Sequence, residues 1–272
     1  MATLEIISSC KKEKIADNFS KGVSHYLEHS QVQKECADKL LNILRTLNNL
    51  IPDGSILEIG CGTGFVTQGL IKQFPNRFLD IIDISLEMLN YCQENLQISD
   101  TEKELIKFKE IDGEKLDIDN NSYAAIISSF TVQWFQDIIN SFNRLIKTLK
   151  PGGILLVAFP NDRCFPEWKN ACDALNLPFT RNQLPNSKQL IQNLPIDNIQ
   201  TYFYEDEITI SYKNASEFFR SIKVIGAGLN LNNQKLSIPE MKQLINYWNN
   251  HSNLDGIEVT YHVTFLVITK IS

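Results

Sequence analysis

The feature that most constrains the fold of this chain is a glycine-rich segment that directly follows an apolar run. Residues 56–64 read Ile-Leu-Glu-Ile-Gly-Cys-Gly-Thr-Gly, so three of the 12 glycines stand at alternate positions, Gly60, Gly62 and Gly64. Glycine adopts left-handed backbone conformations and has no Cβ, which lets a turn approach a ligand closely. A helix that begins after the turn offers free N–H groups. The segment therefore predicts a strand, a ligand-binding turn and a helix.

Strand and helix patterns alternate along the first 160 residues. Residues 14–50 are expected to be helical, and residues 1–12 are expected to be loose. The pattern then predicts strands over 55–59, 78–83, 106–110, 124–129 and 154–159, and helices over 65–74, 86–96 and 138–149. Residues 150–153, Lys-Pro-Gly-Gly, are expected to form a turn. Alternation of this kind predicts an α/β fold with a mostly parallel sheet, right-handed crossovers and helices on both faces.

The regular alternation of strand and helix patterns ends after Phe159. The pattern there predicts strands over 201–211 and 257–271, and helices over 166–175, 187–194, 215–224 and 239–248. We expect N-terminal helices over 1–50, an α/β core over 51–160, a largely helical insertion with one core strand over 161–255, and a final core strand over 256–272. Such an insertion would lie over the carboxyl ends of the strands, where open α/β sheets bind ligands.

Composition limits the partners of the chain. The net charge is −6, and the longest basic block is Lys11–Lys14, so nucleic acid is not an expected partner. No apolar run reaches the roughly 18 residues that cross a membrane, and the N-terminus lacks the apolar core of a signal peptide. The six cysteines form no C-x-x-C pair and, with four histidines, give no zinc spacing. A cytoplasmic protein without a metal is expected.

Two cofactor classes compete for the glycine turn. A dinucleotide fold requires G-x-G-x-x-G, but Phe65 occupies the position of the third glycine. The spacing here is G-x-G-x-G, with Glu58 two residues before the first glycine, and it resembles the first motif of class I S-adenosylmethionine (SAM) methyltransferases. A pyrophosphate is an anion that favours a helix N-terminus, whereas the ammonium and sulfonium of SAM suit a carboxylate. A glycine-rich turn without a ligand is the remaining alternative.

The ends of the next strands carry further candidates. Asp83 ends the second strand 19 residues after Gly64, where α/β nucleotide folds place a carboxylate that accepts both ribose hydroxyls. Ile84 and Met88 would form an apolar wall for the adenine, although Met88 could equally be a core residue.

The third and fourth strands add two weaker candidates. Asp112 and Gly113 follow the third strand, where an acid could accept the adenine amine or simply form a turn. Ser129 ends the fourth strand and would face the crevice where the strand order reverses. The order of these motifs, each at the end of a strand, is more specific than any single one.

Over about residues 17–270 the chain resembles the malonyl-acyl-carrier-protein O-methyltransferases of biotin synthesis. The stretches that carry the likeness are residues 19–26, 57–64, 83–88, 129–134, 220–227 and 260–262. The cofactor motifs are common to many methyltransferases, so Gln133-Trp134 and residues 220–227 are the discriminating ones.

The resemblance implies a Rossmann-like sheet with an antiparallel last strand and an insertion that forms a substrate lid. It implies SAM as cofactor, S-adenosylhomocysteine as product and no metal. The cofactor-binding residues that it implies, together with the strand-end candidates, are His25, Tyr26, Glu58, Gly60, Cys61, Gly62, Gly64, Asp83, Ile84, Met88, Asp112, Gly113, Ser129 and Trp134. His25 could also be an ordinary histidine, and Trp134 could line the substrate channel or simply pack.

The family's reaction methylates the free carboxylate of a malonyl thioester on acyl carrier protein, with coenzyme A as an alternative carrier. A carboxylate nucleophile requires no general base, and a bidentate arginine is its natural anchor. Arg220 is the first candidate for this anchor and Lys223 the second, with Tyr26 as a further catalytic candidate. Both cations could instead lie on a solvated helix face or dock the carrier.

Acyl carrier protein is acidic, so a net-acidic enzyme should offer it a local basic patch. The candidates are Arg144, Lys147, Lys150, Lys213, Arg220, Lys223, Lys235 and Lys242.

Two alternatives to this function remain: a small-molecule carboxyl methyltransferase of the trans-aconitate type, and a SAM-binding protein without catalysis. A monomer without a nucleic-acid or membrane partner is expected.

Overall fold

The computed structural model describes residues 2–231, 234–252 and 255–271. Its strands are β1 (Ser55–Ile59), β2 (Leu79–Asp83), β3 (Ile106–Glu110), β4 (Tyr123–Ser129), β5 (Leu149–Pro160), β6 (Ile199–Tyr212) and β7 (Ile257–Lys270). Its α-helices are α1 (Ala2–His29), α2 (Gln31–Leu47), α3 (Phe65–Gln73), α4 (Leu86–Asn95), α5 (Asp100–Lys103), α6 (Ile138–Thr148), α7 (Pro166–Ala174), α8 (Ser187–Gln192), α9 (Ala215–Val224) and α10 (Ile238–Asn250). Short 3-10 helices are η1 (Asn48–Leu50), η2 (Gly113–Lys115), η3 (Val132–Trp134) and η4 (Ile196–Asn198).

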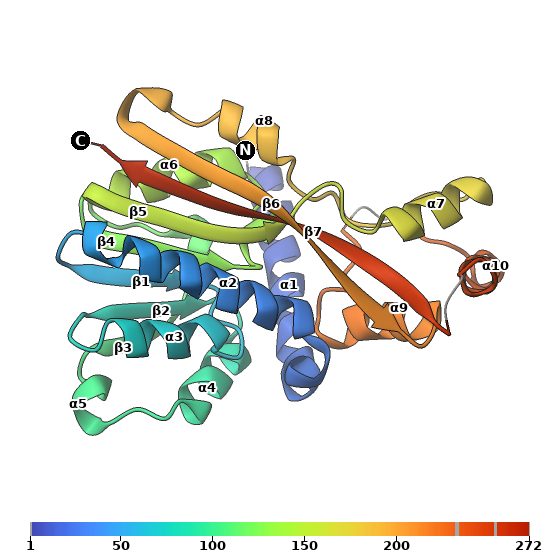
Figure 1. The fold of residues 1–272 in the computed structure, drawn as a ribbon, viewed down its shortest axis with the longest axis horizontal. Helices are drawn as coiled ribbons and strands as arrows, with labels where there is room; N and C mark the ends of the chain where they lie inside the picture. The colour runs from blue at the N-terminus through green and yellow to red at the C-terminus, as the bar shows by residue number, and fades with distance from the viewer. Residues whose placement is uncertain (1, 232–233, 253–254, 272) are drawn as a thin grey trace. The chain divides into compact units, whose positions relative to one another are not determined.

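The strands form one seven-stranded sheet in the order β3-β2-β1-β4-β5-β7-β6 (Figure 1). Strands β1 to β5 pair in parallel, and the last strands are antiparallel to them. Parallel neighbours require crossover connections, which the intervening helices supply. The predicted α/β fold with a mostly parallel sheet and an antiparallel last strand is confirmed.

Two compact units make up the chain. The first unit consists of Met1–Val32, Pro160–Pro185 and Asp206–Val263, and the second of Gln33–Phe159, Asn186–Glu205 and Thr264–Ser272. Strands β6 and β7 contribute residues to both. The predicted four-part division with a lid stays a prediction, and its outermost residues, 1 and 272, lie outside the described residues.

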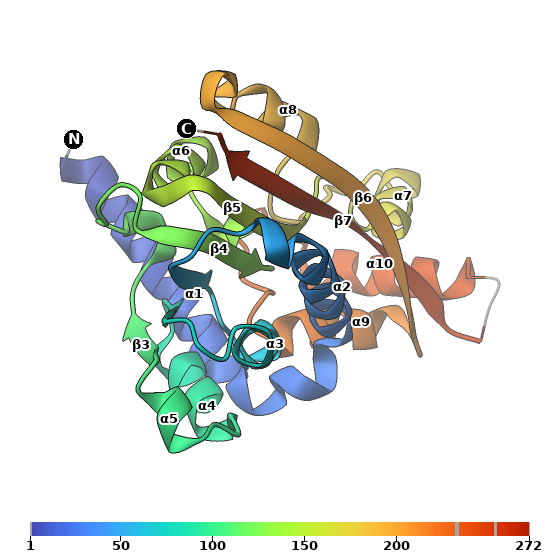
Figure 2. The same ribbon diagram turned by 60° about the vertical axis from the view of Figure 1, so that its left-hand side comes forward.

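Helices cover both faces of the parallel strands in the second unit. Figures 1 and 2 show α2 and α3 on one side of these strands and α6 on the other. Gly69 allows α3 to approach α2 closely, because a Cβ there would lie 2.2 Å from Leu41 Cδ1. On the opposite face, Phe142 and Leu145 of α6 pack into a core cluster with Ile126 of β4. Strands that are covered on both faces have nearly continuous apolar sequences, and β4 is an example.

Three local expectations are wrong. Helix α1 already begins at Ala2, so residues 2–12 are not loose, and the short helix α5 was not expected. Residues 150–153 were expected to form a turn before the strand, yet β5 runs through them. Its register against β4 shifts between Tyr123 and Ala125, and Gly152 takes a φ of 75°. Pairing with β4 therefore begins at Leu149 and resumes at Ile154, so the Pro-Gly-Gly segment is an irregularity within β5 and not a turn before it.

The Phe142→Ala substitution tests this core. The Phe142 side chain is fully buried, so its truncation should lower the free energy of unfolding by about 3–5 kcal/mol. Urea denaturation measures the change. Lys147→Ala on the exposed side of α6 should stay within about 0.5 kcal/mol of the wild type, and equal stability of all three proteins would contradict the packing described.

Candidate functional site

The turn after β1 is built from three glycines in left-handed conformations. Gly60, Gly62 and Gly64 have φ values of 75°, 52° and 93°. A Cβ on Gly60 would lie 2.0 Å from Thr131 Oγ1, whereas the Cβ position of Gly62 has no atom within 4 Å. Gly60 thus needs to be glycine for conformation and space, while Gly62 presents open backbone to its surroundings.

Asp83 at the end of β2 holds this turn. Its Oδ2 accepts a hydrogen bond from the Gly62 N–H at 2.9 Å, and its Oδ1 accepts one from the Ser85 N–H at 2.9 Å. Burial raises the pKa of Asp83, and the backbone hydrogen bonds oppose that rise. The Ile84 N–H and the Cys61 thiol also interact with this carboxylate, so hydroxyl donors of a ligand would share its acceptor positions with the turn.

Glu58 is the second buried carboxyl group of the site. Its side chain lies in β1 with 2% of its surface exposed, and Thr67 Oγ1 donates to its Oε2 at 2.7 Å. Burial raises the pKa of Glu58 to about 8, and the neighbouring Asp83 charge adds to the rise. At neutral pH the group therefore holds a proton unless positive charge arrives beside it.

Cys61 contributes backbone rather than a reactive thiol. A hydrogen bond with Cys92 and burial raise the pKa of Cys61 well above its ordinary value. The Cys92 side chain packs against Gly64, where a Cβ would lie 3.0 Å from its Sγ. A neutral, buried thiol of this kind is inert, so the position serves to shape the turn.

The next candidates follow along the strand ends. Ile84 is half-buried after β2, and Met88 is buried in α4. Asp112 caps η2 by accepting the Glu114 N–H at 3.0 Å. A Cβ on Gly113 would lie 2.3 Å from Ile59 Cγ2, which brings the end of β3 close to the end of β1.

Ser129 is the candidate at the end of β4, and half-buried Trp134 follows in η3. The buried hydroxyls of Ser129 and Thr63 have no hydrogen-bond partner within the described part of the chain. Two buried carboxyl groups, open glycine backbone and hydroxyls that lack partners fit a ligand that carries both positive charge and hydroxyl groups. Glu58, Cys61, Asp83, Asp112 and Ser129 thus all lie at the carboxyl ends of neighbouring strands, as predicted.

The first unit holds the other predicted residues. Tyr26 is buried in α1, and His25 is exposed, with Nδ1 3.9 Å from Glu28 Oε2. Arg220 and Lys223 are exposed on α9. The roles predicted for these four side chains stay predictions.

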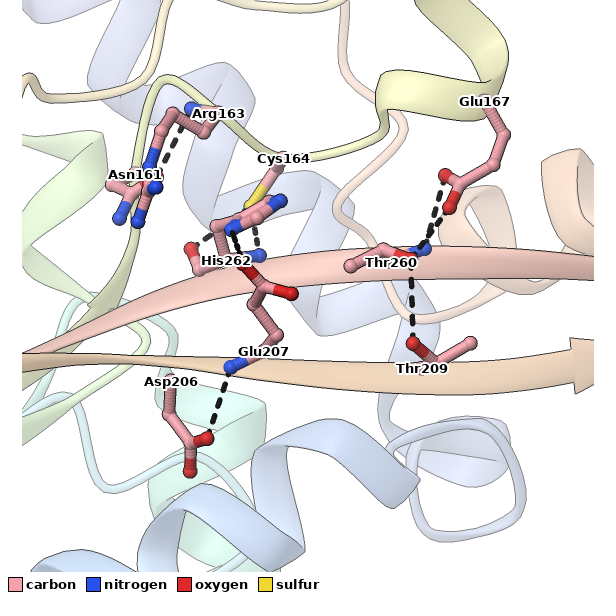
Figure 3. Close-up of polar contacts among 9 residues, drawn as sticks. All are labelled: Asn161, Arg163, Cys164, Glu167, Asp206, Glu207, Thr209, Thr260 and His262. Atoms are coloured by element: carbon pink, nitrogen blue, oxygen red, sulfur yellow. Dashed lines mark hydrogen bonds and ion pairs between the residues drawn. The ribbon is translucent and has the colours of Figure 1, made fainter.

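The stretch 260–262 lies on β7 in the first unit (Figure 3). Glu167 accepts the Thr260 N–H at 3.1 Å, and Cys164 Sγ accepts the His262 N–H at 3.3 Å. The same thiol donates to the His262 carbonyl at 3.1 Å, and burial raises the pKa of Cys164 to about 12. These contacts connect the segment after β5 to β7. The Cys164 thiol is therefore a structural group and not a nucleophile.

Two residues at the turn were missed by sequence reasoning. Thr67 donates to Glu58, and Thr131 fills the space beside Gly60. Thr67 lies in the first turn of the helix that follows the glycines, and a hydroxyl at this position is the signal that could have revealed it. Thr131 comes from the loop after β4, and only the strand order places it there.

The described residues lack two features that would bear on function. No helix among them is long and apolar enough to cross a membrane. They also contain no group of three or more His, Cys, Asp or Glu side chains that could hold a metal ion.

Fold and site together define a class I SAM-dependent methyltransferase. The model of a methyltransferase domain family matches residues 56–153, which include the glycine turn and the ends of β1 to β4. The structure is similar to that of the plantazolicin methyltransferase BpumL in complex with S-adenosylhomocysteine, with a TM-score of 0.57 and 15% identity over 100% of both chains.

The sequence relatives identify a narrower family within this class. The chain is 32% identical over 266 residues to malonyl-[acyl-carrier protein] O-methyltransferase 2 of Ilyobacter polytropus, which covers 95% of this chain and 98% of the relative. It is 29% identical to the biotin biosynthesis bifunctional protein BioCD of Bordetella avium over 78% of this chain and 43% of that protein. The chain belongs to the family of malonyl-acyl-carrier-protein O-methyltransferases.

The raised pKa of Glu58 predicts a pH dependence of stability. Since the pKa in the folded state is about 8 and the ordinary value is 4.5, the stabilising contribution is fully present below the ordinary value and is lost as pH rises toward the folded value. The Glu58→Gln variant carries no such proton. Its free energy of unfolding, measured without cofactor, should therefore increase relative to that of the wild type between about pH 5 and 8.

The control for this comparison is Glu104→Gln, which changes an exposed carboxylate and should follow the wild-type pH profile. Parallel profiles for Glu58→Gln and the wild type would show that Glu58 does not bind a proton in the folded protein at neutral pH.

Proposed function

We propose that this enzyme transfers the methyl group of SAM to the free carboxylate of a malonyl thioester carried on acyl carrier protein, in biotin synthesis. The observation that carries the proposal is the 32% identity that extends over 95% of this chain and 98% of a malonyl-acyl-carrier-protein O-methyltransferase. The likeness thus includes the segments beyond the shared methyltransferase core. We further propose a monomer that acts in the cytoplasm, without a nucleic-acid or membrane partner.

The cofactor site supports this chemistry through its charges. When bound, SAM supplies an electrophilic methyl carbon to a carboxylate oxygen, and the electron pair of the broken carbon–sulfur bond remains on sulfur. Glu58 would face the positive charge, Asp83 would accept the ribose hydroxyls, and Gly60, Gly62 and Gly64 would let the backbone approach. Ser129 would offer its hydroxyl as a further hydrogen-bonding group.

The remaining cofactor residues would enclose the adenine and the methyl donor. We assign the adenine to Ile84, Met88, Asp112 and Gly113, and we assign Cys61 to the cofactor through its backbone. His25 and Tyr26 of α1, with Trp134, would close the site, and the helical insertion would form a substrate lid. The exclusion of water favours methyl transfer because opposite charges cancel as the ester forms.

No general base is required in this reaction, since the nucleophile is already an anion. Positioning of the two reactants then supplies most of the catalysis, worth up to roughly 7–11 kcal/mol in ideal cases. Arg220 and Lys223 are proposed to bind the substrate, either at its carboxylate or at its carrier. Their exposure on α9 favours binding of the carrier over binding of the substrate carboxylate.

A methyl-transfer assay with labelled SAM tests the substrate. Malonyl-acyl carrier protein should become methylated, and trans-aconitate should not. Methylation of trans-aconitate with no label on the malonyl carrier would instead support a small-molecule carboxyl methyltransferase and overturn the proposal.

The Asp83→Ala substitution tests the cofactor assignment. Loss of the carboxylate that holds both Gly62 and the ribose should weaken SAM binding at least tenfold, about 1.4 kcal/mol, by calorimetry. Asp80→Ala is the matched control, because Asp80 lies on the same strand but pairs with Lys109 at 2.9 Å. An unchanged dissociation constant for Asp83→Ala would refute the assignment.

A further inference from the structure

Two of the stretches on which the family resemblance rests meet in the first unit. Helix α9 lies beside α1 (Figures 1 and 2), and two glycines bring their backbones together. A Cβ on Gly22 would lie 2.7 Å from the Val224 carbonyl oxygen. Gly226, with a φ of 81°, would place a Cβ 2.7 Å from the Asn18 carbonyl oxygen. The contact therefore fixes residues 19–26 against residues 220–227.

The helix segments that make this contact carry exposed cations. Lys21 precedes Gly22 on α1, and Lys223 precedes Val224 at the end of α9. Arg220 lies one turn before Lys223 on the same face of α9, and Lys14 lies two turns before Lys21 on the same face of α1. All four side chains are exposed, and none of them makes an ion pair with another described residue.

Helix α1 carries Glu5, Glu13, Asp17 and Glu28, and α9 carries Glu217, but no ion pair joins a described acidic side chain to any of these four cations. Glu217 precedes Arg220 by one turn, but its carboxylate accepts the Lys213 N–H at 2.6 Å. Asp17 precedes Lys21 by one turn and does not pair with it among the described residues. The four cations, which we call the α1–α9 basic surface, thus keep their charge available in a chain whose net charge is −6.

We propose that the α1–α9 basic surface docks the acidic acyl carrier protein that delivers the malonyl group. This inference rests on the proposed function and deepens it by naming where the carrier binds. A positive surface on a net-negative enzyme attracts and orients an acidic partner, and it repels a second copy of itself. The close backbone contact at Gly22 and Gly226 places the two helices that carry these cations side by side.

Two other roles of these cations would give different results. Cations in the last turn of α9 interact favourably with the helix dipole, which affects stability and no particular substrate. A carboxylate anchor at Arg220 would act on every malonyl thioester, whatever carries it. Only a docking role predicts that substitutions lower the reaction with the carrier-bound substrate and leave the reaction with a carrier-free substrate unchanged.

The test compares malonyl-acyl carrier protein with malonyl-pantetheine as substrates of the full-length enzyme. For Lys14→Glu/Lys21→Glu, kcat/KM on the carrier substrate should fall at least tenfold, and kcat/KM on malonyl-pantetheine should change less than twofold. Arg220→Glu should shift the ratio of the two kcat/KM values in the same direction. The wild-type kcat/KM on the carrier substrate should also fall as salt is added, and the double variant should lose this dependence.

Lys188→Glu is the matched control, since it reverses a charge at an exposed position of α8 in the second unit, outside the candidate basic residues. It should leave both substrates unaffected, and melting temperatures confirm that each variant is folded. An equal loss on both substrates in Arg220→Glu, or an unchanged carrier reaction in the double variant, overturns the docking surface.

Direct binding separates this inference from the proposed function. If the wild type methylates neither substrate, the proposed function fails, and titration with the acyl carrier protein still tests the surface. Binding to the wild type that is lost in Lys14→Glu/Lys21→Glu supports docking. No binding to the wild type, or equal binding to both proteins, overturns it.

Discussion

Two carboxyl groups buried at the ends of neighbouring parallel strands are the constraint on which the site depends. Glu58 of β1 and Asp83 of β2 are 2% and 8% exposed, and burial raises the pKa of both. Among the described residues neither forms an ion pair with lysine or arginine. Instead they accept hydrogen bonds from Thr67 and from backbone N–H groups. Such a site lacks a cation of its own and gains free energy when a positively charged cofactor binds.

Three strands hold these groups in place. Asp83 links β2 to the turn after β1, and Ser128 Oγ of β4 donates to the Ile59 carbonyl at 2.8 Å. Thr131, just beyond β4, occupies the space that any side chain at position 60 would need. The central position of β1 between β2 and β4 therefore determines the shape of the turn. The proposed cofactor site is thus a consequence of the strand order as much as of the glycine motif.

Local sequence patterns were sufficient where a single segment decides its own structure. The strand over 55–59 and the helix over 215–224 coincide with β1 and α9, and Glu58, Asp83 and Asp112 lie at or just after the ends of their strands. Segments that depend on partners distant in sequence were less predictable. The pairing of β5 with β4 overrides the turn expected at 150–153. Thr131 and the contact between Gly22 and Val224 arise from packing, which no local pattern encodes.

The central claim is that a buried, protonated Glu58 gives up its proton when SAM binds. Calorimetry near pH 7 in buffers of different ionisation enthalpy counts the protons that binding releases. The amine of SAM also titrates, so the informative quantity is the difference between the wild type and Glu58→Gln. With a pKa of about 8 before binding, the wild type should release about one proton more than the variant. Equal proton release by the two proteins would contradict the claim.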